Sequence, residues 1–175
     1  QINTDKGIIV DKYMKTNIPN IFAAGDVAQS CDLAYEDSAV RALWANAVEQ
    51  GRVAGFNMAG QNIEYDGSMV MNSIEFFNLP VVSMGITRPK GTEFEEMVFF
   101  DEKRETYKKF VLKHSRLVGM IAIGNIRNCG VFLKLIKEGI DISSIKSKLK
   151  SENFSYASIL DLIKQKDEIY RMDGF

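Results

Sequence analysis

Gly25-Asp26 is the first candidate for chemistry, because it follows a short apolar run at residues 21–24. Such a run, with Pro19 just before it, predicts a short buried strand. Open α/β sheets bind their ligands at the carboxyl ends of strands. A carboxylate there accepts hydrogen bonds from sugar-like hydroxyls, and a glycine before it lets the backbone approach a ligand closely. The same dipeptide also makes ordinary strand-to-loop turns, so alone it leaves both interpretations open.

The elements around this dipeptide predict an α/β layer. Residues 8–10 form another uninterrupted apolar run after the turn residues Asp5-Lys6-Gly7, and such runs are typical of strands that helices cover on both faces. After Asp26 we expect an irregular acidic loop containing Asp32, Glu36 and Asp37.

A helix rich in small residues follows this loop. It should continue to about Met58 and stop at Gly60, a favourable C-terminal cap. Apolar positions recur at three- and four-residue steps from Ser38 onward, so periodicity alone allows the helix to begin there.

The second half of the chain predicts a different kind of domain. Turn residues at positions 64–67 mark a boundary, which gives domains at residues 1–64 and 65–175. Asn128 and Ser155 are suited to cap two later helices, the first ending at Gly139 and the second continuing to Ile169. We therefore expect an α+β domain with an antiparallel sheet and terminal helices. Its five predicted strands are residues 74–77, 81–86, 97–101, 107–112 and 117–123.

Composition excludes several classes of partner. The 175 residues are 46% hydrophobic and 26% charged, with a net charge of -1, which is the balance of a chain that can bury a core. A pI near 5.9 gives no field that attracts nucleic acid or a membrane surface. The most apolar stretch, residues 117–123, is too short to cross a bilayer and no signal pattern opens the chain, so we expect a cytoplasmic protein. Cys31 and Cys129 form no Cys-x-x-Cys pattern, so no metal site is expected.

Longer motifs resemble one family. Gly7-Ile8-Ile9-Val10-Asp11, then Thr16, then the run from Ile21 to Ala28 is similar to the second FAD-binding motif of the pyridine-nucleotide disulfide oxidoreductase superfamily. The stretch from Leu43 to Gly60 looks like the helix that follows this motif in the NADH:rubredoxin reductase and nitrite-reductase-like branch. Met71-Asn72-Ser73, residues 81–85, Leu117-Val118-Gly119 and Ile123-Gly124-Asn125 are similar to that branch's C-terminal domain.

This resemblance implies roles for four residues. Asp26 is expected to bind the ribityl chain of FAD, and Gly25 to permit its close approach. The matching helix begins near Trp44, so the backbone N–H groups of Trp44 and Ala45 are expected at the pyrimidine edge of the flavin. Two features leave alternatives open: Ala45 stands where the family usually has proline, and Trp44 is equally compatible with a core or interface aromatic.

The resemblance also implies what this chain does not contain. The Gly-x-Gly-x-x-Gly turns that hold the pyrophosphates of FAD and NAD are absent from the 175 residues. The chain therefore resembles the second half of a discontinuous FAD domain plus a C-terminal domain. No catalytic residue is assigned, and we expect the fragment alone to be catalytically incompetent.

The implied parent is an FAD-dependent NAD(P)H oxidoreductase. It would transfer hydride from NADH or NADPH to FAD and then pass electrons to rubredoxin, a similar carrier, or oxygen. The alternative function is a docking or homodimerisation module formed by the C-terminal domain. The sequence does not select the acceptor or the nicotinamide.

Overall fold

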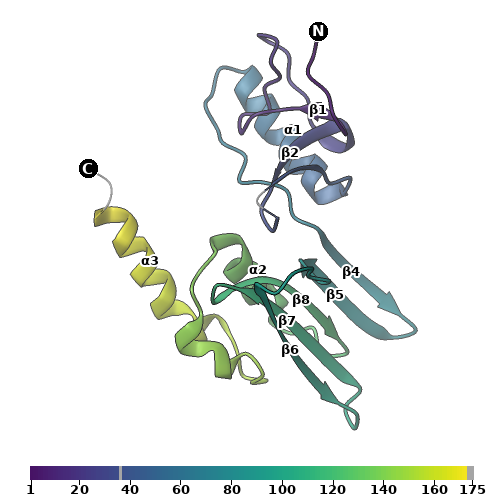
Figure 1. Ribbon diagram of the computed structural model, residues 1–175, viewed down its shortest axis with the longest axis vertical. Coiled ribbons are helices and arrows are strands. Elements are labelled where there is room, and N and C mark those ends of the chain that lie inside the picture. The colour runs from purple at the N-terminus through teal and green to yellow at the C-terminus, as the bar shows by residue number, and fades with distance from the viewer. Residues whose placement is uncertain (36, 173–175) are drawn as a thin grey trace. The chain divides into compact units, whose positions relative to one another are not determined.

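The computed structural model describes residues 1–35 and 37–172, and it divides into two compact units, Gln1–Val70 and Met71–Phe175 (Figure 1). The boundary falls later than the turn residues at 64–67 predict. Tyr65 is the reason, because it is buried in the hydrophobic core of the first unit. The backbone N–H of Tyr65 also donates to the carbonyl of Lys12 at 2.7 Å, which ties this segment to the first unit.

The first unit contains a three-stranded sheet in the order β1-β2-β3 and one α-helix. Strand β1 (Ile8–Ile9) pairs parallel with β2 (Ala28–Asp32), and β2 pairs antiparallel with β3 (Asp37–Val40). Helix α1 (Trp44–Met58) follows. The start of α1 at Trp44 agrees with the family resemblance and excludes the earlier start at Ser38, because Ser38 lies in β3.

Two local predictions for this unit are wrong. The segment expected to be an irregular acidic loop is a β-hairpin, in which Asp32 lies opposite Asp37; Glu36 lies outside the described residues. The strand expected at residues 21–24 is reduced to one bridge between Lys15 and Phe22. Among the described residues, this short apolar run has no long partner strand with which to form a ladder. The strand β2 begins after this run and the turn at residues 25–27 that follows it.

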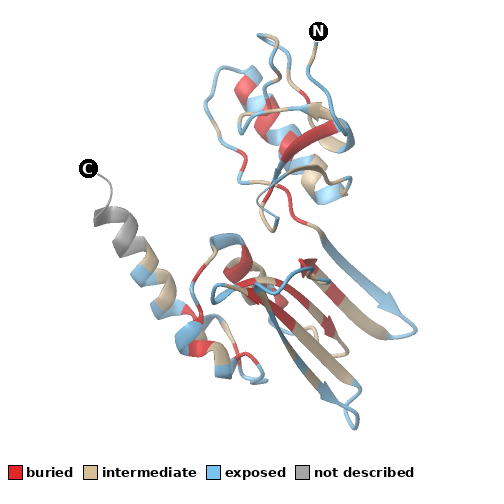
Figure 2. Ribbon diagram, in the orientation of Figure 1, coloured by how far each residue is buried: buried red, intermediate tan, exposed pale blue. Residues whose placement is uncertain are grey.

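The core of the first unit lies between α1, the segment that joins β1 to β2, and the segment that follows α1. Met14, Val53, Ala54 and Tyr65 form its buried centre, and Phe22 packs against them. In Figure 2 the buried positions of α1 alternate with exposed ones along the helix, as an amphipathic helix requires.

The second unit is built on a five-stranded antiparallel sheet in the order β4-β5-β8-β7-β6, which confirms the predicted fold class. Each expected strand is present with small changes at its ends. They are β4 (Met71–Phe76), β5 (Leu79–Gly85), β6 (Phe94–Asp101), β7 (Thr106–Lys113) and β8 (Arg116–Ile123).

The terminal helices follow the sheet. Helix α2 (Cys129–Glu138) begins after Asn128 and ends at Gly139, as predicted, but the side chain of Asn128 makes no capping hydrogen bond and donates to the carbonyl of Phe154 instead. Ser155 forms a capping box, but it caps the 3-10 turn η3 (Tyr156–Ser158), and α3 (Leu160–Met172) begins after that turn. A further 3-10 helix, η2 (Ser143–Lys148), lies between α2 and η3. None of the described helices has the length and apolar character needed to span a membrane.

Helix α2 covers one face of this sheet. The rings of Phe110 on β7 and Phe132 on α2 lie 5.0 Å apart, and Phe132 stacks on Phe154 at 4.9 Å. All three are almost fully buried. Rows of aromatic side chains at this spacing contribute beyond the area they bury. The opposite face of the sheet is more exposed, and the edge strand β4 is exposed throughout (Figure 2).

Candidate functional site

The Gly25-Asp26 turn lies in the first unit as a short 3-10 turn, η1 (Gly25–Val27), immediately before β2. Gly25 has a φ of +79°, a conformation that only glycine adopts without strain. A Cβ at this position would come no closer than 3.6 Å to the nearest atom, the Cβ of Ala47. The backbone conformation, rather than crowding, therefore requires glycine here. The side chain of Asp26 is exposed.

The first turn of α1 lies against the same 3-10 turn, as the proximity of Ala47 to Gly25 indicates. Leu43 precedes the helix and makes no side-chain capping hydrogen bond, and no acidic residue lies in the first turn. The helix N-terminus thus keeps its partial positive charge and its N–H donors.

Trp44 and Ala45 are both exposed at this helix N-terminus, and Trp44 is 83% exposed. Trp44 is therefore not a core residue of this chain. The interface and flavin-side alternatives both remain compatible with an aromatic ring in this position. All four residues selected from the sequence lie on the turn or on the helix packed against it.

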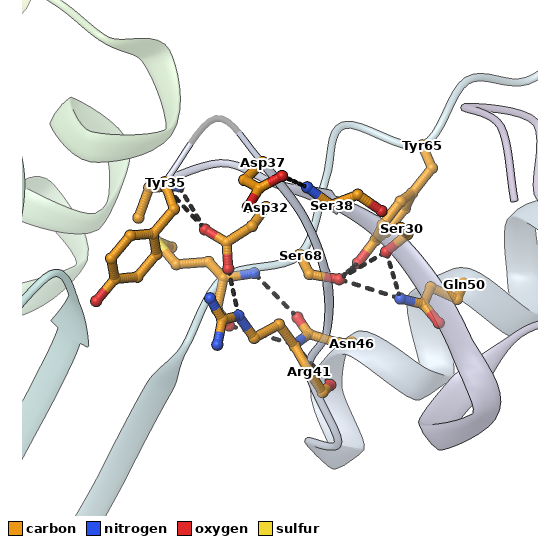
Figure 3. Close-up of polar contacts among 12 residues, drawn as sticks. Ser30, Asp32, Tyr35, Asp37, Ser38, Arg41, Asn46, Gln50, Tyr65 and Ser68 are labelled. Atoms are coloured by element: carbon orange, nitrogen blue, oxygen red, sulfur yellow. Dashed lines mark hydrogen bonds and ion pairs between the residues drawn. The ribbon is translucent and has the colours of Figure 1, made fainter. Parts of the chain in front are cut away.

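Gln50, Ser30, Ser68 and Tyr65 form a buried polar cluster (Figure 3). Gln50 of α1 is 1% exposed, and its Oε1 accepts a 2.7 Å hydrogen bond from the backbone N–H of Gly25. Its Nε2 donates to Ser30 Oγ and to Ser68 Oγ, both at 3.1 Å. Ser68 Oγ also lies 3.0 Å from the hydroxyl of Tyr65. Burial is the main reason why the pKa of Tyr65 lies above its usual value, so the phenol is held in its neutral form.

A second polar group fixes the chain that leads into α1. Asp32, 1% exposed, accepts hydrogen bonds from the N–H groups of Ala34 and Tyr35 and pairs with Arg41. Asn46 in the first turn of α1 donates to the carbonyls of Arg41 and Met69, both at 3.3 Å (Figure 3). Asp32, expected in an irregular loop, thus anchors the hairpin.

The remaining polar candidates contribute no second site. Cys129 is buried at the start of α2, and burial raises the pKa of its thiol, which favours the unreactive protonated form. His114 lies exposed in the turn between β7 and β8, with a φ of +49°. Within the described residues, no group of three or more metal-ligating side chains is found.

A small α/β unit joined to an antiparallel C-terminal unit is the fold found in FAD- and NAD-dependent oxidoreductases. Residues 1–51 match the family model for pyridine nucleotide-disulphide oxidoreductases, and residues 71–140 match the model for the rubredoxin NAD+ reductase C-terminal domain. The chain belongs to the pyridine nucleotide-disulfide oxidoreductase family, in the branch similar to rubredoxin and nitrite reductases.

Curated relatives agree with this family. The chain is 32% identical over 143 residues to the nitrite reductase [NAD(P)H] of Bacillus subtilis (strain 168), a match that covers 81% of the chain and 17% of that enzyme. It is 34% identical over 150 residues to pyridine nucleotide-disulfide oxidoreductase domain-containing protein 1 of Drosophila melanogaster, covering 81% of the chain and 32% of that protein. The chain thus spans a third or less of these two relatives.

Solved structures show the same fold. NADH:rubredoxin oxidoreductase from Clostridium acetobutylicum superposes with a TM-score of 0.54 at 26% identity, over 92% of this chain and 38% of that one. Water-forming NADH oxidase from Lactobacillus brevis superposes with a TM-score of 0.73 at 21% identity, over 99% of this chain and 44% of that one.

Sequence reasoning missed the cluster of Gln50, Ser30, Ser68 and Tyr65. One signal was available: Gln50 and Asn57 are polar residues on the face of α1 that also carries the buried Val53 and Ala54. A polar residue within an apolar stripe must find partners inside the protein. Its partners are distant in sequence and could not be named from it.

Proposed function

We propose that this chain forms the flavin-contacting half of an FAD-dependent NAD(P)H oxidoreductase. The observation that carries the proposal is the packing of the Gly25–Val27 turn against α1, which holds an exposed carboxylate beside a helix N-terminus without a side-chain cap. Membership of the family supports it independently.

The residues present suit one part of FAD. Asp26, an exposed carboxylate, can accept hydrogen bonds from the ribityl hydroxyls. The backbone N–H groups of Trp44 and Ala45 can donate to the pyrimidine edge of the ring. Bound FAD would accept a hydride from NAD(P)H and release electrons to an acceptor.

The contribution of α1 would be electrostatic. A helix N-terminus carries about half a positive charge. Donors fixed before reaction stabilise negative charge without reorganising. These N–H groups would therefore favour the electron-rich state of the ring. The acceptor we propose is a carrier such as rubredoxin, or oxygen.

The test is FAD content in the full-length protein that contains this chain. Asp26→Ala should weaken FAD binding about 10-fold or more, because a hydrogen bond to a charged group contributes about 1.5–3 kcal/mol. Asp37→Ala, which removes another exposed carboxylate of the same unit, should leave it unchanged. Wild-type protein without flavin absorbance near 450 nm and without NAD(P)H oxidation would reject the proposal.

A second function is favoured by the open face of the second unit's sheet, and we propose that this face binds a second copy of the chain. Ile74, Val81, Ile123, Tyr107 and Phe100 form one row across all five strands by their pairing register. Ile74 and Phe100 are 58% and 69% exposed. Exposed apolar patches of this kind mark association sites.

Charge on the same face favours self-association. Glu96 and Lys109 pair with each other there, so this pair adds no net charge to the face. A cavity of about 820 Å³ lined by Phe76, Phe100 and Tyr107 extends this surface. A strongly charged carrier would find little complementary charge on this row.

Light scattering distinguishes a second copy of the chain from a carrier protein as the partner of this face. The full-length protein should be a dimer, and Ile74→Lys with Phe100→Lys should give a monomer, whereas Lys103→Glu at an exposed turn should not. A wild-type monomer would reject dimerisation, and a monomer that binds rubredoxin would favour carrier docking instead.

A further inference from the structure

We propose that Gln50 is a positioning residue of the flavin site, which fixes the Gly25-Asp26 turn relative to the N-terminus of α1. The inference rests on the proposed function, because it concerns the same turn and the same helix end. It adds a residue that does not face the ligand and acts through hydrogen bonds to the backbone.

Gln50 holds the Gly25-Asp26 turn directly. The N–H of Gly25 donates to Gln50 Oε1 at 2.7 Å, so the backbone of the residue adjacent to Asp26 is bonded to the helix. Gln50 lies six positions after Trp44, which places it about 9 Å along the helix axis at ~1.5 Å per residue. Gln50 therefore links the turn to the helix whose N-terminal N–H groups are proposed to contact FAD.

Only one orientation of the Gln50 carboxamide satisfies its hydrogen-bond partners. Its Nε2 donates to Ser30 Oγ and Ser68 Oγ, both at 3.1 Å. A reversed carboxamide would place its NH2 group against the N–H of Gly25, where two donors would meet. The N–H of Gly25, which can only donate, thus selects the orientation that presents an oxygen to the turn, and the two serine hydroxyls accept from the NH2 group.

The residues that hold the Gln50 carboxamide are themselves buried and fixed by hydrogen bonds. Ser30 lies on β2, and Ser68 lies beside the buried hydroxyl of Tyr65. Gln50, Ser30 and Ser68 are each 1% exposed or less. All buried side-chain polar atoms among the described residues have hydrogen-bond partners. A fully satisfied buried network has one arrangement, and it cannot relax toward water.

Asn57 provides a matched control on the same helix. It is 6% exposed, and its Nδ2 donates to the carbonyls of Tyr13 and Ile63. Its Oδ1 accepts from the N–H of Ile63 at 2.8 Å. Like Gln50 it is a buried carboxamide that anchors backbone to α1, but it acts near the C-terminal end of the helix.

The experiment compares Gln50→Leu with Asn57→Leu in the full-length protein. Both should lower the unfolding midpoint, because each leaves buried backbone groups without partners. Gln50→Leu should weaken FAD binding about 10-fold or more, and any retained flavin should have a more negative reduction potential. Asn57→Leu should change FAD affinity less than about three-fold.

Gln50→Glu provides a rescue variant and a safeguard if Gln50→Leu does not fold. It keeps an oxygen facing the N–H of Gly25, so its FAD affinity should lie closer to wild type than that of Gln50→Leu. Equal FAD losses in the Gln50→Leu and Asn57→Leu proteins, or unchanged affinity in Gln50→Leu, would overturn the positioning role. A Gln50→Glu protein without FAD would also overturn it. A wild-type protein that binds no FAD would instead reject the proposed function itself.

Discussion

Gly25 meets two conditions at once, and each restricts the residue at this position. Its φ of +79° requires a residue that tolerates the left-handed region, and its N–H must point at Gln50. The turn is therefore determined by the backbone and by a helix partner. Both conditions therefore also fix the direction of Asp26, the residue after Gly25.

Gly25→Ala should destabilise the chain by about 1–2 kcal/mol, because a Cβ is unfavourable at this φ. The new methyl would lie 3.6 Å from Ala47, an ordinary contact, so steric overlap adds little. Denaturant unfolding measures the loss. Gly51→Ala is the control: nothing lies within 4 Å of its added Cβ and it is inside α1, so it should stabilise by up to about 1 kcal/mol. Equal effects of the two changes would contradict this account.

The sequence predicts Gly25 and Asp26 as site residues, but it does not predict Gln50. Gly25 and Asp26 lie in one contiguous motif with fixed spacing, so resemblance selects them. Gln50 bonds to residues 25, 20 and 18 positions away. Hydrogen bonds at such separations depend on how β2, α1 and the segment after α1 pack. A single sequence carries no record of that packing.

At the scale of elements, a sequence pattern predicts a strand correctly when the strand that pairs with it lies nearby in the sequence. Residues 107–112 and 117–123 are predicted as consecutive strands of an antiparallel sheet separated by a short segment, and the structure pairs them as β7 and β8. Residues 21–24 have the composition of a strand, but within the described part of the chain they form a single bridge, between Lys15 and Phe22. Strand composition reports burial and shape, whereas a ladder needs a neighbouring strand.

Helix α3 is joined to α2 by a contact that titration can probe. Lys166 Nζ donates to Glu138 Oε2 at 2.8 Å and to the Glu138 carbonyl at 2.6 Å. Lys166→Met should speed hydrogen exchange of α3 amides about two- to five-fold, as expected for a partly exposed pair contributing ~0.5–1 kcal/mol. Lys134→Met is the control, since Lys134 contacts Glu138 from within α2. Equal acceleration by both would exclude a specific α2–α3 contact.

The same contact predicts a pH dependence. The hydrogen bond from Lys166 lowers the pKa of Glu138 below its ordinary value of 4.5. A carboxylate with a lowered pKa contributes stability above its unfolded-state pKa, and that stability is lost as pH falls through the folded-state pKa. Exchange of α3 amides, corrected for intrinsic rates, should therefore rise below about pH 4.5 in wild type. In Lys166→Met this acid-induced component should be smaller; an unchanged component would assign it to other groups.

At the scale of the whole molecule, the chain is two units with separate sheets, and the sequence locates their junction only approximately. Turn composition at residues 64–67 indicates where the chain changes character, but Tyr65 and Ser68 are bonded into the first unit. A turn-rich stretch can be the last packed segment of a domain as well as a linker. Contacts across the chain, rather than composition, decide between the two.

These 175 residues alone offer contacts to only part of FAD. Asp26 and one helix end address only the ribityl and ring portions of FAD, and Gly-x-Gly-x-x-Gly turns for its pyrophosphate are absent from this sequence. Too few contacts remain to offset the entropy lost on binding a dinucleotide. Calorimetry should therefore detect no binding of micromolar or tighter affinity to the 175-residue chain, whereas the full-length protein should bind FAD tightly. FMN, which lacks the adenylate, should bind the chain no more weakly than FAD does. Tight FAD binding by the chain alone would mean that this half of the site is sufficient.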